Sequence, residues 1–234
     1  MLAAIVWGAV AASSLVIGAI LGVARTWPTR LIGAVLAFGA GALVSSVSFE
    51  LAAEGFQVGG PLPLAIGIGA GAGAFFLANR GVQRLGSRGR GSAGLPLALG
   101  AFLDGIPEQA VLGIGLAAGD GVSVALLVAI FVSNLPEGIG SASEMHLGGR
   151  SSPAVLKLWL VVAALCALAT VAGYGLADLL GPRWQGAIDG FAAGALLVML
   201  VDEMIPEAYD KAKDPAGLLT VLGFAVAAGL SASS

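Results

Sequence analysis

Charged side chains are scarce in this sequence. Only 11% of the 234 residues are Asp, Glu, Lys or Arg, while 58% are hydrophobic and the mean hydropathy is +0.97. An ordinary soluble domain is about a quarter charged, so this composition excludes a water-soluble globular protein. Glycine is abundant, with 37 residues spread through the apolar segments, and small residues let membrane helices pack closely. We therefore predict an all-α integral membrane protein with a single domain over residues 1–234.

Cysteine and histidine are nearly absent. Cys166 and His146 are the single representatives of their types, which excludes a disulfide framework and a Cys-rich metal motif. The motifs H-E-x-x-H and G-x-S-x-G are also missing, although a membrane hydrolase needs a metal or nucleophile motif of this kind. We predict that the protein is not an enzyme, and nothing in its basic segments indicates nucleic-acid binding.

Eight segments are apolar over the length of about 20 residues that a membrane-spanning helix needs. They are residues 2–24, 31–54, 58–79, 95–118, 121–145, 154–180, 184–209 and 215–232. Between the third and fourth, residues 80–94 are predicted to form an Arg-rich loop. Lys and Arg concentrate in this and the other odd-numbered connections, so the positive-inside rule places those connections in the cytoplasm. Both termini are then expected on the non-cytoplasmic side of the plasma membrane.

The second and seventh segments resemble each other. FGAGALVSSVSFELAAE at 38–54 aligns with FAAGALLVMLVDEMIPE at 191–207, which pairs Glu50 with Glu203 and Glu54 with Glu207. The second and seventh segments are five helices apart. Because this number is odd, the two related helices must cross the membrane in opposite directions. This pattern predicts an inverted repeat, an architecture in which transporters bind substrate near the bilayer midplane. Similar Gly/Ala/Leu-rich composition is the alternative explanation, and the matched carboxylates favour the repeat.

A Pro-Glu pair follows a polar residue in three segments. The motifs are DGIPEQA from Asp104, SNLPEGI from Ser133, and the stretch from Asp202 to Glu207. Proline inside a helix frees the carbonyl four residues earlier, and side chains three or four residues apart share a helix face. Each motif is therefore expected to present a free carbonyl oxygen and a carboxylate at nearly the same position along the helix axis.

These acids lie within apolar segments, where each charge costs roughly 2.5–3.5 kcal/mol on insertion scales. The only Lys or Arg inside a predicted segment is Lys157, near a helix end, so basic partners are not expected to compensate them. The acids must be protonated, solvated, or paired with external cations. Clustered carboxylate, amide and carbonyl oxygens suit divalent ions, and we favour cation binding. Protonated or solvated carboxylates that serve only helix packing are the alternative.

The sequence is similar to the ZIP family (Zrt/Irt-like proteins) of divalent metal transporters. The resemblance rests on SNLPEG at 133–138, DGIPEQ at 104–109, VDEMIPEA at 201–208, and the eight-segment layout. It implies eight helices in a 3+2+3 arrangement, an inverted repeat that relates helices 1–3 to helices 6–8, and a metal site between helices four and five. It also implies that this helix pair moves against the other helices. The transported zinc, manganese or iron would be the substrate, without any stored cofactor.

The resemblance also implies the residues of the metal site and of the route beside it. They are Asp104, Glu108, Ser133, Asn134, Glu137, Asp202, Glu203 and Glu207. Asp104 stands where the family has a histidine, and Gly105 where it has an asparagine. An all-oxygen site selects zinc less strongly than an imidazole site does, which favours manganese or another harder divalent ion.

Two other function classes remain open at this stage. One is a non-transporting membrane protein, such as a metal sensor or assembly subunit, with a degenerate site. The other is a proton- or sodium-coupled carrier of an organic solute. The expected partners are a divalent metal ion and the lipid bilayer. A homodimer is permitted by the close-packing glycines, which are Gly39, Gly41, Gly67, Gly69, Gly71 and Gly73.

Overall fold

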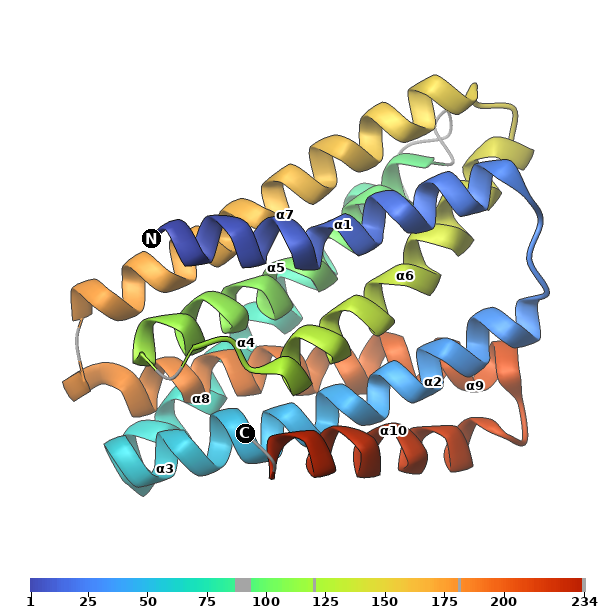
Figure 1. Cartoon of the computed structure of the whole chain (residues 1–234). Helices are drawn as coiled ribbons and strands as arrows, with labels where there is room; N and C mark the ends of the chain where they lie inside the picture. The colour runs from blue at the N-terminus through green and yellow to red at the C-terminus, as the bar shows by residue number, and fades with distance from the viewer. Residues whose placement is uncertain (87–93, 120, 181, 233–234) are drawn as a thin grey trace.

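A computed structural model describes the backbone of residues 1–86, 94–119, 121–180 and 182–232. Within these ranges, the side chains of residues 82, 83, 85, 86, 94–101, 104, 182 and 183 are outside the described part. The described residues form helices joined by short connections, and they contain no strand (Figure 1). Five helical stretches are long and apolar enough to cross a membrane, among the described residues. The chain is therefore an all-α membrane protein.

The helical elements follow the apolar segments of the sequence closely. They are α1 (Leu2–Ala24), α2 (Thr29–Ser46), η1 (Val47–Ala52), α3 (Ala53–Gly59), α4 (Pro61–Gly86), α5 (Gly94–Ala118), α6 (Val124–Leu147), α7 (Ser152–Leu180), α8 (Pro182–Met199), η2 (Leu200–Met204), α9 (Ile205–Ala212) and α10 (Ala216–Ser231). The prediction of a loop from residue 80 is wrong over 80–86. Helix α4 continues to Gly86 because no proline interrupts it there, whereas residues 87–93 lie outside the described part.

Two long helices each contain one π-helical turn, η1 between α2 and α3 and η2 between α8 and α9. The first turn begins at Val47 and the second at Leu200, which are equivalent positions in the two aligned sequence segments. Pro206 follows η2 in the first turn of α9, and because the helical elements are continuous there, its missing N–H removes one backbone donor from the rod. π-Turns within helices occur frequently at functional sites, and η2 contains Asp202 and Glu203.

Glycines bring the helices together in two groups. In the first group, α1 packs against α6 and α7, and α5 packs against α7. Gly18 and Gly138 there place α1 directly against the backbone of α6. In the second group, α4 and α3 pack against α8, and α2 packs against α10, with Gly71 placing α4 against the carbonyl of Phe191. A side chain at any of these three glycines would overlap the neighbouring helix backbone.

The close-packing glycines are mainly used within the chain. Gly39 faces Ser133 of α6, and Gly41, Gly67 and Gly71 each lie against the backbone of another helix. Only Gly69 and Gly73, of the six proposed for a homodimer, have open space where a Cβ would be. The other four lie in contacts between helices of the same chain, where a small residue lets the two backbones approach closely. They are therefore not available for a contact with a second copy.

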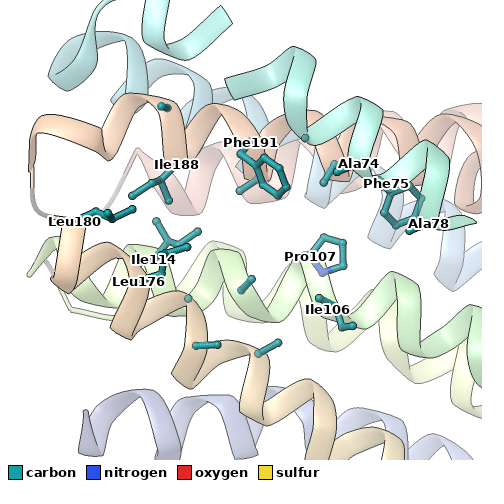
Figure 2. Close-up of a pocket in the computed structure, with 18 of the residues that line it drawn as sticks. Ala74, Phe75, Ala78, Ile106, Pro107, Ile114, Leu176, Leu180, Ile188 and Phe191 are labelled. Carbon is teal, nitrogen blue, oxygen red and sulfur yellow. The ribbon is translucent and has the colours of Figure 1, made fainter. Parts of the chain in front are cut away.

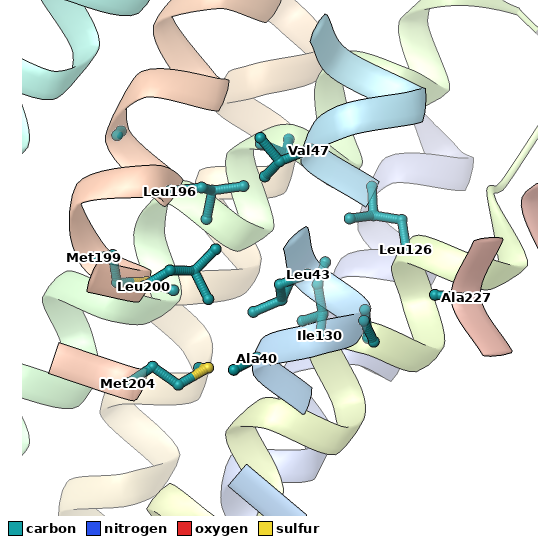
Figure 3. Close-up of a cluster of buried hydrophobic side chains, with 14 of the residues drawn as sticks. Ala40, Leu43, Val47, Leu126, Ile130, Leu196, Met199, Leu200, Met204 and Ala227 are labelled. Carbon is teal, nitrogen blue, oxygen red and sulfur yellow. The ribbon is translucent and has the colours of Figure 1, made fainter. Parts of the chain in front are cut away.

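The largest apolar cluster joins the two groups. It includes Leu43 and Val47 from the α2 side, Leu126 and Ile130 from α6, and Leu196 from α8 (Figure 3). All five side chains are buried, with exposed fractions of 3% or less. A second cluster around Trp159 and Leu15 lies within the first group, between α1, α6 and α7.

Candidate functional site

The central polar contact links α5 to α6. Glu108 lies one residue after Pro107 in the middle of α5, and its side chain is 0% exposed. The Ser133 hydroxyl on α6 donates a hydrogen bond to Glu108 Oε1 over 2.9 Å, while Glu108 Oε2 has no partner. Gly39 of α2 lies against Ser133 and leaves room for this contact. The helix pair thus holds a carboxylate with one oxygen available to a ligand.

Asn134 and Glu137 extend this group along α6. The Asn134 amide lies beside the Glu108 carboxylate, and both its polar atoms are buried without a hydrogen-bond partner. Glu137 follows one turn later, feels the charge of Glu108, and has a buried Oε2 that also lacks a partner. Buried polar atoms are nearly always paired in native proteins. Four unpaired atoms in one place therefore provide polar groups that can interact with a bound ion.

Acids from the second helix group approach Glu137. Glu203 of η2 and Glu207 of α9 both act electrostatically on Glu137. Glu203 is partly buried and Glu207 is exposed, so the exposure of these acids increases along the helix. The residues predicted from sequence on three separate segments, Glu108, Glu137 and the two later acids, are therefore brought into one acidic row.

The expectation that no basic side chain reaches these acids is wrong. Helix α9 continues to Ala212, beyond the predicted end at 209, which places Lys211 one turn after Glu207. The Lys211 ammonium forms an ion pair with Glu207 and also acts on Glu137. It lies 3.5 Å from the position that a Cβ on Gly140 would occupy. Sequence analysis assigned Lys211 to a connection because it underestimated the length of the helix.

Two of the predicted site residues are not placed in this row. Asp202 has an exposed side chain on η2, and it is absent from the described groups that act on Glu137. Asp104 lies in α5, one turn before Glu108, but its side chain is outside the described residues. The described row begins at its buried end with Glu108, Ser133 and Asn134. It continues through Glu137, Glu203 and Glu207 to Lys211.

The row is closed on one side and open on the other. Ile130 lies one turn before Ser133 on α6, and Leu43 lies one turn beyond Gly39 on α2, so the apolar cluster of Figure 3 covers the row toward the α3 end. At the α9 end the side chain of Glu207 is 45% exposed. The exposed end of the row is therefore its α9 end in this conformation.

A cavity of about 660 Å³ lies beside the row, but it is a different kind of space. It is bounded by α4, α5, α7 and α8, with Phe75, Ile106, Leu176 and Phe191 among its lining residues (Figure 2). Its wall is almost entirely apolar and contains none of the predicted ligands. The cavity separates the α5–α7 pair of the first helix group from the α4–α8 pair of the second.

Sequence analysis missed two further buried polar contacts. Thr170 of α7 donates a hydrogen bond to Gln109 Oε1 over 2.6 Å and ties α5 to α7. Gln185 Nε2 of α8 donates to Asp189 Oδ1 over 2.9 Å. Asp189 could have been found by counting every acid within the apolar segments, because it is flanked by apolar residues and glycine. The search for repeated motifs did not detect it.

The chemistry of the central row is that of an oxygen-rich cation site. Glu108 and Glu137 repel each other when both are charged, and burial in low dielectric strengthens that repulsion. A divalent cation between them would remove the repulsion and use the unpaired carboxylate and amide oxygens. Such oxygens are the ligands preferred by hard and intermediate divalent ions. A nucleophile with an adjacent base is not found among these residues.

No protein-family model matches the sequence. The chain is similar to a protein of Arabidopsis thaliana that is described as a candidate zinc transporter, with 30% identity over 184 residues. The aligned region covers 74% of this chain and 29% of that protein. The chain thus spans less than a third of the length of the curated relative that it matches.

Proposed function

We propose that this protein transports a divalent transition-metal cation across a membrane, through the acidic row between α5 and α6. The observation that carries the proposal is the group of four unpaired buried atoms on Glu108, Asn134 and Glu137. Membrane helices contain charged residues rarely, and such residues commonly mark an ion pathway. The similarity to a plant protein described as a candidate zinc transporter supports the same function.

The row binds the metal as cargo. Glu108, Asn134 and Glu137 supply oxygen ligands, and Ser133 orients Glu108 through its hydrogen bond. Glu203 and Glu207 continue the negative potential toward the exposed end of the row. No described histidine or cysteine joins these residues, so the site lacks the soft ligands that select zinc strongly. We expect it to accept manganese, iron or zinc, with the choice set by ion size and by the availability of each metal.

We assign the chain to the ZIP family and its topology to eight crossings in a 3+2+3 arrangement. The three crossings beyond the five found by hydropathy are α5, the α8–η2–α9 rod and α10. Helix α10 is apolar but has only 16 residues. Helix α5 and the rod contain three of the four acids of the row, Glu108, Glu203 and Glu207. The inverted repeat is supported by η1 and η2, which occupy equivalent positions. The rods that contain them run in opposite directions (Figure 1). We place the protein in the plasma membrane with both termini outside.

Transport requires that the site become accessible from each side in turn. Within the first group, α1 packs against α6 and α7, and α5 packs against α7. Between the groups, the apolar cavity separates the α5–α7 pair from the α4–α8 pair, while α2 packs against α6, so a relative movement of the groups requires α2 to slide along α6. We infer that α1, α5, α6 and α7 move together relative to the second group. This division differs from the expectation that the fourth and fifth helices move alone, because α5 packs against α7 and α6 packs against α1.

The decisive experiment is metal uptake by the purified protein in liposomes, with manganese, iron, zinc, cobalt, cadmium and magnesium compared. Glu137→Gln should abolish uptake of every transported ion, because it removes the charge that faces Glu108. The matched control is Glu144→Gln, an exposed acid two turns later on the same helix. Equal uptake by the wild type and the Glu137→Gln variant would remove Glu137 from the site.

The same assay separates the other function classes. Metal-dependent thermal stabilisation without flux would indicate a binding or sensor protein. Uptake of an organic solute that follows a proton or sodium gradient and ignores divalent metals would indicate a coupled carrier. In that case the unpaired oxygens of Glu108 and Glu137 would bind protons or sodium instead.

A further inference from the structure

A second buried carboxylate lies at the opposite end of the bundle from Glu207. Asp189 is in the first half of α8, and its exposed fraction is 2%. Gln185 satisfies Asp189 Oδ1, but Asp189 Oδ2 is buried and has no hydrogen-bond partner. Leaving a buried charged oxygen unpaired is costly. The central row does not relieve this cost, because Asp189 is not among the described groups that act on Glu137.

The unpaired oxygen lies beside helix α3, which also contains a second acid. A Cβ built on Gly55 of α3 would lie 2.9 Å from Asp189 Cβ and 3.4 Å from Asp189 Oδ2. Gly55 therefore makes the space into which the carboxylate points. Its neighbour Glu54 raises the electrostatic repulsion on Asp189. Two acidic residues, Glu54 and Asp189, thus interact where α3 packs against α8, and one of them has a buried, unpaired oxygen.

The two ends of the bundle differ in charge although their sequences are related. Glu207 at the α9 end is equivalent to Glu54 at the α3 end in the aligned segments. Lys211 neutralises Glu207, but the residue equivalent to Lys211 is Val58. At the α3 end the aligned position therefore has no ammonium group, and the charged group that interacts with Glu54 is a second carboxylate, Asp189.

We propose that Asp189 and Glu54 form a second cation site, at the α3 end, for a hard or intermediate divalent ion. Gln185 acts there as a positioning residue that fixes the Asp189 carboxylate through its hydrogen bond. The apolar cluster around Leu43 separates this site from the central row. The site loads the cargo ion at the end of the bundle that is closed in this conformation. In that role the inference rests on the proposed transport function.

The test is manganese binding to the purified full chain, measured by the electron paramagnetic resonance signal of free Mn²⁺. The variant Glu108→Gln/Glu137→Gln removes the central site and should still bind about one ion per chain. Adding Asp189→Asn should weaken that remaining binding by about tenfold or more, which corresponds to about 1.4 kcal/mol. Asp178→Asn is the matched control, because Asp178 is an exposed acid at the same end of the bundle, near the end of α7.

Folding is checked independently of binding. Asparagine has the shape of aspartate and can still accept the Gln185 hydrogen bond, so the Asp189→Asn variant should keep the wild-type thermal midpoint without manganese. Manganese should still raise the thermal midpoint of Glu108→Gln/Glu137→Gln. This remaining increase should disappear when Asp189→Asn is added.

The outcomes distinguish the two proposals. Wild-type binding that disappears completely in Glu108→Gln/Glu137→Gln overturns the second site and leaves the transport proposal intact. Remaining binding that Asp189→Asn does not change also overturns it. Binding that is unaffected by Glu108→Gln/Glu137→Gln but lost in Asp189→Asn supports the second site and contradicts the central one.

Discussion

Lys211 is the residue whose position changes the electrostatic description of the site most. Its ammonium group neutralises Glu207 and reaches Glu137 from the second helix group. A divalent cation that enters from the α9 end must therefore pass a positive charge. The Lys211 side chain is long and flexible, and it is 21% exposed, so the ammonium group can move aside.

Replacing Lys211 with glutamine should strengthen divalent-metal binding. The ion pair is partly exposed, and such pairs are worth about 1 kcal/mol or less, so we expect the dissociation constant to fall by up to about fivefold. Isothermal titration with manganese measures this change. Lys213→Gln is the control, since Lys213 forms a surface pair with Asp210 and both side chains are well exposed. Equal affinities in the two variants would show that Lys211 does not influence the site.

At the scale of the helices, packing depends on backbone contacts that only glycine permits. Helix α4 presents two kinds of glycine a few residues apart. Gly71 lies against the Phe191 carbonyl of α8, whereas Gly73 has no atom within 4 Å of an added Cβ. The same helix therefore offers a sensitive position and an internal control.

Gly71→Ala should destabilise the protein, because the new methyl group overlaps the α8 backbone. Overpacking of a close contact costs about 1–3 kcal/mol, and we expect a clear fall in the thermal unfolding midpoint in detergent micelles. Gly73→Ala should leave the midpoint unchanged or raise it slightly, because alanine is a better helix former by about 1 kcal/mol. A Gly71→Ala variant as stable as the wild type would mean that α4 and α8 do not pack as described.

For the whole molecule, the arrangement of the helices predicts opposite accessibility of two connections. Gln57 in the last turn of α3 and Ser151 just before α7 are both exposed. Helix α3 and the start of α7 lie at opposite ends of the bundle (Figure 1). In proteoliposomes or cells, a membrane-impermeant maleimide should label Gln57→Cys from one side only. It should label Ser151→Cys only from the other side, which we propose to be the cytoplasmic one because Lys and Arg concentrate in the odd-numbered connections. Cys166 is buried and gives little background. Labelling of both positions from the same side would contradict the eight-crossing topology.

Much of the candidate site was accessible to sequence analysis because its residues break a simple local rule. Glu108, Asn134 and Glu137 are polar groups inside apolar segments, and the repeated Pro-Glu pairs draw attention to them. Their distances from one another were not accessible. The Ser133–Glu108 hydrogen bond depends on how α5 and α6 cross, and Gly39 of a third helix lies against Ser133 at that point.

The sequence by itself determined that this chain is an all-α membrane protein with acids in its interior, because hydropathy and charge are local properties that can be counted along the chain. Tertiary structure alone decided which acids meet, which are neutralised, and which remain unpaired. The pairing of Lys211 with Glu207 required a helix end to extend by a few residues. The meeting of Asp189 with Glu54 required α3 and α8 to cross at Gly55. Electrostatic energy depends on distances and burial in three dimensions, and neither quantity is written in the order of the residues.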